Sequence, residues 1–112
     1  MTIITTDRWG NETINPKRSV LDKTLNDLFL DRTLPEVLSE ISITDGVFHF
    51  DIKKNGWVYL EDDEHHYYMK ELEVEKIRSL WECFYEGKMD DILAEPWIEG
   101  IPAFNGDWSN DK

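Results

Sequence analysis

Two adjacent histidines beside an acidic run are the first residues of this chain whose types suggest chemistry. His65 and His66 directly follow Glu61-Asp62-Asp63-Glu64, and imidazole and carboxylate groups together can bind Zn²⁺. Neighbouring residues of an extended segment point to opposite sides, however, so the two rings do not converge on one ion. The run also lacks the ligand spacing and central glycine of a calcium-binding loop. We therefore predict an exposed acidic loop with no metal and no cofactor.

A single cysteine is the next candidate for chemistry. Cys83 would need a histidine and an orienting group beside it to act as a nucleophile. The expected sheet places His49 on the face away from the core, which separates the two side chains. Asp51 and Asp62 could form a carboxylate dyad, but no surrounding motif supports one. No GxSxG motif and no glycine-rich phosphate loop occurs, so we expect no enzyme activity and a structural thiol at Cys83.

Apolar residues at helical spacing predict the elements that would position these side chains. A helix is expected over residues 16–31, with Asn15 at its N-cap, and a short second helix over residues 33–40. The strongest amphipathic pattern covers residues 74–86 and ends at Gly87, a typical position after a helix C-terminus. Another helical turn is expected over residues 89–94.

Two turn signals predict a sheet between these helices. Asp45-Gly46 and Asn55-Gly56 are typical of two-residue hairpin turns. Such turns would pair Ile41 with Phe50 and Ile52 with Tyr59, and directly paired residues share a face. The expected apolar face comprises Ile41, Ile43, Phe48, Phe50, Ile52, Trp57 and Tyr59. The expected mixed face comprises Ser42, Val47, His49, Asp51, Lys53, Val58 and Leu60.

Together these signals predict one α+β domain over residues 1–112. It would contain the N-terminal helix or helices, a four-stranded antiparallel meander completed by a strand at 66–70, and the amphipathic helix packed on one sheet face. Residues 1–14 are expected to form an N-terminal arm or an edge strand. The C-terminal region is expected to lie as an extended tail on the body, with residues 105–112 frayed.

The charge is strongly negative and unevenly placed. The formal net charge is −12, and residues 1–34 contain equal numbers of acidic and basic residues, so the excess comes from residues 35–112. Such a surface repels nucleic acids and anionic membranes and attracts basic proteins. The single cysteine and the lack of a signal peptide or membrane-length apolar run lead us to expect a cytoplasmic protein.

These properties predict a protein that binds a basic partner. The chain resembles small bacterial immunity proteins in size and composition, which implies an inhibitor of a basic toxin, such as a nuclease, that occludes the positive active site. The alternatives are a phage or plasmid DNA mimic, of the anti-restriction or anti-CRISPR kind, and a small ligand-binding domain or enzyme using the mixed sheet face. The predicted partner-binding residues are Glu61, Asp62, Asp63, Glu64, Glu71, Glu73, Glu82, Glu86, Asp90, Asp91, Trp97 and Trp108.

Overall fold

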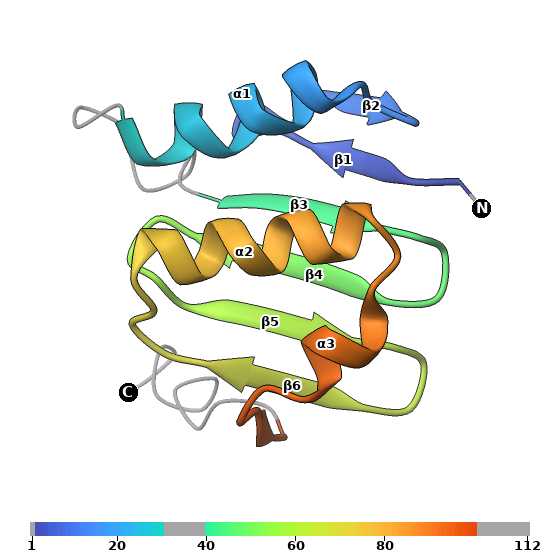
Figure 1. Ribbon diagram of the computed structural model, residues 1–112, viewed down its shortest axis with the longest axis vertical. Coiled ribbons are helices and arrows are strands. Elements are labelled where there is room, and N and C mark those ends of the chain that lie inside the picture. The colour runs from blue at the N-terminus through green and yellow to red at the C-terminus, as the bar shows by residue number, and fades with distance from the viewer. Residues whose placement is uncertain (1, 31–39, 101–112) are drawn as a thin grey trace.

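In the part of the chain that the structure describes, seven antiparallel strands form one sheet, and three helices cover one of its faces (Figure 1). The computed structural model describes residues 2–30 and 40–100. The strands are β1 (Ile4–Thr6), β2 (Glu12–Ile14), β3 (Glu40–Thr44), β4 (His49–Lys53), β5 (Val58–Glu61), β6 (His66–Met69) and β7 (Ile98–Glu99), in the spatial order β2-β1-β3-β4-β5-β6-β7. The helices are α1 (Arg18–Leu30), α2 (Val74–Tyr85) and α3 (Met89–Leu93). The predicted α+β class is confirmed, and the sheet is wider than the expected four strands.

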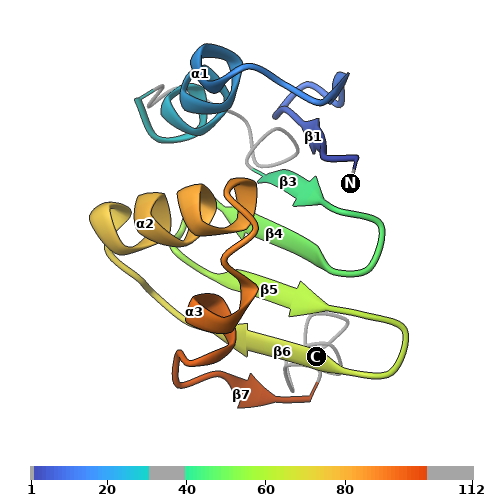
Figure 2. The ribbon, with the colours of Figure 1, turned by 45° about the vertical axis from the view of Figure 1, so that its right-hand side comes forward.

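The core lies between the helices and the sheet. Figures 1 and 2 place α1 beside the β1–β2 hairpin, α2 across β3 and β4, and α3 near β5 and β6. Trp81 of α2 is fully buried, and its indole N–H donates a 3.1 Å hydrogen bond to the carbonyl of Leu21 in α1. Tyr85 adds a 2.9 Å hydrogen bond from its hydroxyl to the Pro16 carbonyl. The two long helices are therefore joined by polar contacts as well as by apolar packing. None of the described helices is long and apolar enough to span a bilayer.

The N-terminal segment belongs to the sheet and does not form an arm. β1 pairs with both β2 and β3, and β2 is an edge strand. The turn between β1 and β2 is held by Asp7, whose carboxylate accepts hydrogen bonds from the backbone N–H groups of Trp9 and Asn11. Asn15 binds the backbone of Ile3 through both its N–H and its side-chain oxygen, so it closes this hairpin and is not the N-cap of α1. The helix accordingly begins at Arg18, later than predicted.

The loop between β3 and β4 is longer than the predicted two-residue turn. Thr44 pairs with His49, and Asp45 accepts hydrogen bonds from the N–H groups of Val47 and Phe48. These local bonds give the backbone an alternative to strand pairing, so the loop extends over residues 45–48. The register is shifted by two residues from the prediction, and Phe50 now pairs with Ile43. A shift of two preserves the faces, and the residues of β3 and β4 that were expected to face the core do so.

The turn between β4 and β5 holds one residue more than predicted, and this changes the faces of β5. Lys53 pairs through its N–H with the carbonyl of Trp57, which leaves three residues in the turn, and Gly56 has a φ of 95°. Three-residue hairpin turns of this kind place a glycine in the left-handed region. Ile52 therefore pairs with Val58, and Val58 and Leu60 are fully buried. The prediction that Trp57 and Tyr59 face the core was wrong, because a one-residue slip exchanges the two faces of a strand.

The remaining elements follow the predicted pattern where the structure describes them. The four strands β3 to β6 form the expected meander, and α2 places Ile77, Leu80, Trp81 and Phe84 in the core. Gly87 follows α2 with a φ of 78°, as its position after the helix predicts. The expected helix over residues 33–40 and the expected frayed end over residues 105–112 fall on, or largely on, positions outside the described residues.

Replacement of Gly56 is expected to destabilise the fold more than replacement of Gly46 in the β3–β4 loop. A Cβ at Gly56 would lie 2.9 Å from the Leu72 carbonyl oxygen, whereas a Cβ at Gly46 would meet nothing within 4 Å. Both glycines have positive φ. We expect Gly56→Ala to lower the free energy of unfolding by about 3 kcal/mol and Gly46→Ala by about 1 kcal/mol. Urea unfolding of both variants measures the difference, and equal losses would show that the contact with Leu72 is unimportant.

Candidate functional site

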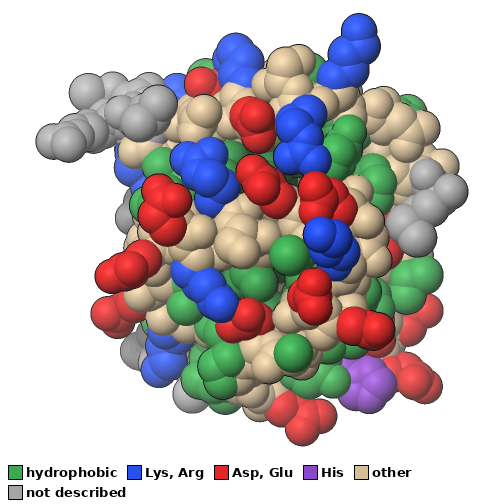
Figure 3. All heavy atoms as spheres, in the orientation of Figure 1, with side chains coloured by type: hydrophobic (Ala, Val, Ile, Leu, Met, Phe, Trp, Pro, Cys, Tyr) green, Lys and Arg blue, Asp and Glu red, His purple; other side chains and the backbone are tan. Residues whose placement is uncertain are grey.

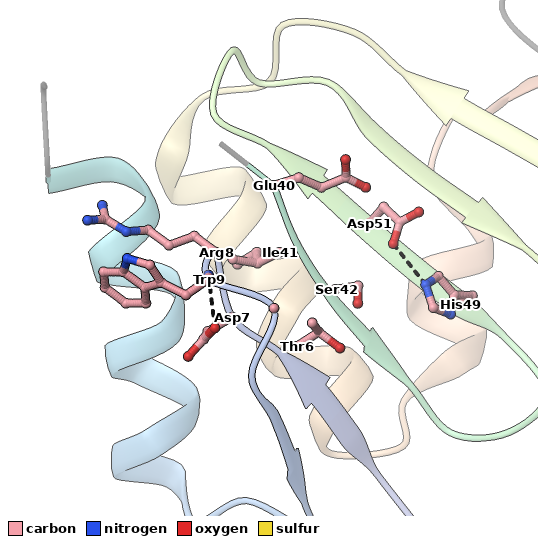
Figure 4. Close-up of a pocket in the computed structure, with 10 residues that line it drawn as sticks. Thr6, Asp7, Arg8, Trp9, Glu40, Ile41, Ser42, His49 and Asp51 are labelled. Carbon is pink, nitrogen blue, oxygen red and sulfur yellow. Dashed lines mark hydrogen bonds and ion pairs between the residues drawn. The ribbon is translucent and has the colours of Figure 1, made fainter. Parts of the chain in front are cut away.

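The helix-free face, by which we mean the sheet face opposite α1, α2 and α3, contains a hollow of about 410 Å³. Figure 4 shows that its lining side chains come from β1, β3, β4 and the turn after β1. The carboxylate of Glu40 lies beside that of Asp51, and Asp51 points toward the ring of His49 (Figure 4). The volume falls in the range of small-molecule sites. The complete lining is Thr6, Asp7, Arg8, Trp9, Gly10, Glu40, Ile41, Ser42, His49 and Asp51.

The hollow contains a histidine–carboxylate pair but no assembled nucleophile. His49 Nε2 lies 2.9 Å from Asp51 Oδ1, and the hydrogen bond to Asp51 raises the pKa of His49 above its ordinary value. Ser42 lies opposite Asp51 in the register, and in the described part of the chain no hydrogen bond joins its hydroxyl to His49. Nucleophilic catalysis requires that a base contact the hydroxyl. The arrangement therefore suits binding of a polar group better than acyl transfer.

The lone thiol is separated from this pair by the sheet. Cys83 is half-buried on α2, which lies on the helix side, and desolvation is the main cause that raises the pKa of its thiol. A raised pKa keeps the sulfur protonated and poorly nucleophilic. Among residues 2–30 and 40–100, no three His, Cys, Asp or Glu side chains are grouped so that they could hold a metal ion.

A second candidate lies at the end of the sheet where the β3–β4 and β5–β6 loops meet. We call this the acidic end and define it by Asp45, Glu61, Asp62, Asp63 and Glu64. The two loops border a shared hollow of about 340 Å³, and Val47 at its side is 66% exposed. Residues 44–49 and 61–66 contain no lysine or arginine. The acidic end therefore combines several carboxylates with one exposed apolar side chain.

Each loop of the acidic end is held by one of its own aspartates. Asp62 Oδ1 accepts hydrogen bonds of 2.9 and 2.7 Å from the N–H groups of Glu64 and His65. The bond from the Glu64 N–H is the main cause that lowers the pKa of Asp62. Asp45 holds the neighbouring loop in the same way through Val47 and Phe48. The exposed Asp63 and Glu64 are thus presented on loops whose backbone is already ordered.

The other predicted acidic residues do not join the acidic end. Glu71 and Glu73 lie between β6 and α2, at the opposite end of the strands (Figure 1). Glu86 lies after α2, where it forms ion pairs of 2.9 Å with Arg18 and 3.2 Å with Lys88. Its hydrogen bond with Lys88 is the main cause that lowers the pKa of Glu86. The predicted set is therefore divided among different parts of the molecule.

The remaining predicted acids also lie on the helix side. Glu82 is 4.0 Å from Arg18, so its charge is partly balanced within the chain. Asp90 and Asp91 occupy the first turn of α3, where the helix dipole favours negative charge. Figure 3 shows acidic and basic side chains alternating over this side of the molecule, while acidic side chains gather with a histidine at the lower right edge. The helix side is thus closer to neutral than the composition alone suggests.

Of the two tryptophans that were predicted to bind a partner, the structure describes Trp97. Trp97 is half-buried, its ring meets Phe50 edge-on at 6.3 Å, and its indole N–H donates to the Ile92 carbonyl at 2.7 Å. These contacts make Trp97 part of the packing around the core and not a free anchor for a partner. Trp108 lies outside the described residues.

Sequence reasoning missed Asp45 of the acidic end and the exposed Val47 beside it. The sequence pattern predicts only a turn at Asp45 and places Val47 on the mixed face of a strand. The signal that identifies them is topological, because the loops after β3 and after β5 must open at the same end of an antiparallel meander.

No family model, curated protein or solved structure matches this chain.

The His49–Asp51 pair is expected to stabilise the fold below neutral pH. The pKa of His49 is raised in the folded state, so its contribution is complete below the ordinary pKa of about 6.5 and is lost as the pH rises through the folded value. His49→Gln should therefore lower the free energy of unfolding more at about pH 5.5 than at about pH 8. Urea unfolding at both pH values measures this, and Asp51→Asn should remove the same pH dependence. A difference from the parent chain that does not change with pH would contradict the expectation.

Proposed function

We propose that this protein is an inhibitor of the immunity type, which binds a basic protein and covers that protein's positively charged active site. A nuclease-type toxin is the partner that this chemistry fits best, because a nuclease must hold phosphates in a positive cleft. The observation that carries the proposal is the acidic end, where two adjacent loops and the last residue of β5 carry five carboxylates and no lysine or arginine.

The state of the loops supports binding without a large entropic cost. Asp45 and Asp62 already satisfy the backbone N–H groups of their loops, so little ordering is needed when a partner docks. Asp63 and Glu64 remain exposed and form no ion pair in the described part of the chain. Their charges can therefore attract a basic surface over roughly one Debye length, about 8 Å at physiological salt.

The exposed side chain of Val47 supports a second element of the interface. It lies beside the shared hollow of the acidic end and has 66% of its surface exposed. Charged groups set the association rate, whereas desolvated contacts near the centre of an interface supply much of the affinity. Val47 would provide such a contact, surrounded by carboxylates that select for a basic partner.

Charge reversal at the acidic end is expected to slow association with the partner. The variant Asp63→Lys/Glu64→Lys avoids Asp62, which holds the loop, and should lower the association rate at least about tenfold at low salt. The matched control is Glu71→Lys/Glu73→Lys, which changes the net charge equally at the opposite end of the strands. Surface plasmon resonance against the partner captured by the full chain measures both rates.

The control separates a local interface from an effect of total charge. Equal loss in both variants would contradict binding through the acidic end, and a rate that does not change between about 0.01 and 0.15 M salt would contradict an electrostatic interface altogether. The captured protein is then assayed for nuclease activity with and without the chain. Capture of a DNA-processing enzyme that is not a toxin would favour the DNA-mimic alternative.

A further inference from the structure

All three histidines of the chain lie at one end of the sheet, each beside a carboxylate. His65 Nδ1 is 3.1 Å from Asp62 Oδ1, and His66 Nδ1 is 3.0 Å from Glu61 Oε2. His49 begins β4 and contacts Asp51 at 2.9 Å. The three histidines come from β4, the β5–β6 loop and β6. All three therefore lie at the acidic end.

The strand register joins two of these histidines into one row. His49 pairs with Glu61 across β4 and β5, and Glu61 pairs with His66 across β5 and β6. Directly paired residues share a face, so Glu61 lies between the two imidazoles on the helix-free face. Protonation of either ring therefore acts on the same carboxylate.

The other charged groups around the histidines are also mainly acidic. The carboxylates of Asp51 in β4, Glu61 in β5 and Glu40 in β3 all raise the pKa of His49. Glu40 is itself paired with Lys53 at 3.0 Å. From β1 and its turn, the hollow beside His49 receives Asp7 and Arg8, and the Arg8 guanidinium donates to the Asp27 carbonyl. His65 stacks on Tyr67 at 6.0 Å and has Asp62, Asp63 and Glu64 as its sequence neighbours. On the far side of β6, the charged residue of β7 is Glu99, which pairs with Tyr67.

We propose that the acidic end is a pH-sensitive binding surface, which releases a basic partner when its three histidines become protonated. This inference rests on the proposed function, because it concerns the same surface and the same class of partner. Histidine is the side chain that ordinarily changes its charge between pH 5 and 8. Three imidazolium groups would offset three of the six negative charges that Asp45, Asp51, Glu61, Asp62, Asp63 and Glu64 carry.

The direction of the effect follows from linkage. A basic partner repels an imidazolium group, so it binds the form with neutral histidines more tightly, and its binding expels protons. Affinity must then fall as the pH drops through the range in which the histidines titrate. The raised pKa of His49 extends this range upward. We expect the dissociation constant to rise about tenfold between about pH 8 and about pH 5.5.

Fluorescence anisotropy with a labelled peptide of arginines only tests the proposal on the full chain, since arginine keeps its charge throughout this pH range. The parent chain is compared at constant ionic strength with the triple variant His49→Gln/His65→Gln/His66→Gln. Glutamine can still donate a hydrogen bond to each carboxylate but cannot become charged. We expect equal binding of the peptide by both proteins at about pH 8, and weaker binding at about pH 5.5 by the parent chain only.

The outcomes separate this inference from the proposed function. If the triple variant binds tightly at about pH 8 and loses affinity with falling pH as much as the parent chain does, the histidine switch is overturned. The proposed acidic interface would not be contradicted by this result. Binding that does not change with pH in the parent chain would likewise overturn the histidine switch alone. Absence of peptide binding at every pH would overturn both proposals. NMR titration of the histidine rings provides a second measurement, because rings that do not titrate above about pH 5.5 could not act as the switch even if the triple variant failed to fold.

Discussion

The register at the β4–β5 turn is the constraint on which the rest of the sheet depends. One additional residue in this turn places Gly56 in the left-handed region and directs Val58 and Leu60 into the core. The turn is fixed from outside as well, since the Leu72 N–H donates a 3.0 Å hydrogen bond to the Gly56 carbonyl. Because side chains alternate along a strand, the same turn places Trp57 and Tyr59 on the helix-free face. Trp57 stacks there on Tyr68 with ring centroids 6.2 Å apart.

The position of the candidate interface follows from which side chains of β5 face the core. Glu61 ends β5 on the helix-free face only because Leu60 before it is buried, and His66 faces the same side as its cross-strand partner. The loops that follow β3 and β5 then open at one end and bring Gly46 and Val47 near Asp62. Burial of apolar side chains thus determines where the carboxylates and imidazoles meet, although none of these polar groups contributes to the core.

Local patterns predicted the elements of this fold better than their pairing. The helical period between Val74 and Tyr85 needs no tertiary information, and its buried stripe was predicted from the sequence. Turn length depends on side-chain hydrogen bonds, such as those of Asp45, which the dipeptide Asp-Gly does not specify. The strands β1 and β2 have only three residues each, too few for a period to be recognised. Charge placement was harder still, because the pair between Arg18 and Glu86 joins residues far apart in the chain.

The strand order also governs how the chain can assemble. Strands β3 to β6 are joined by short loops, so each hairpin closes with a small loss of chain entropy. The pairing of β1 with β3 must instead bring together segments separated by β2 and the whole of α1. Contacts between distant segments form late because their loop-closure cost precedes their gain. We therefore expect the meander that carries the acidic end to form first and the N-terminal hairpin to complete the sheet afterwards.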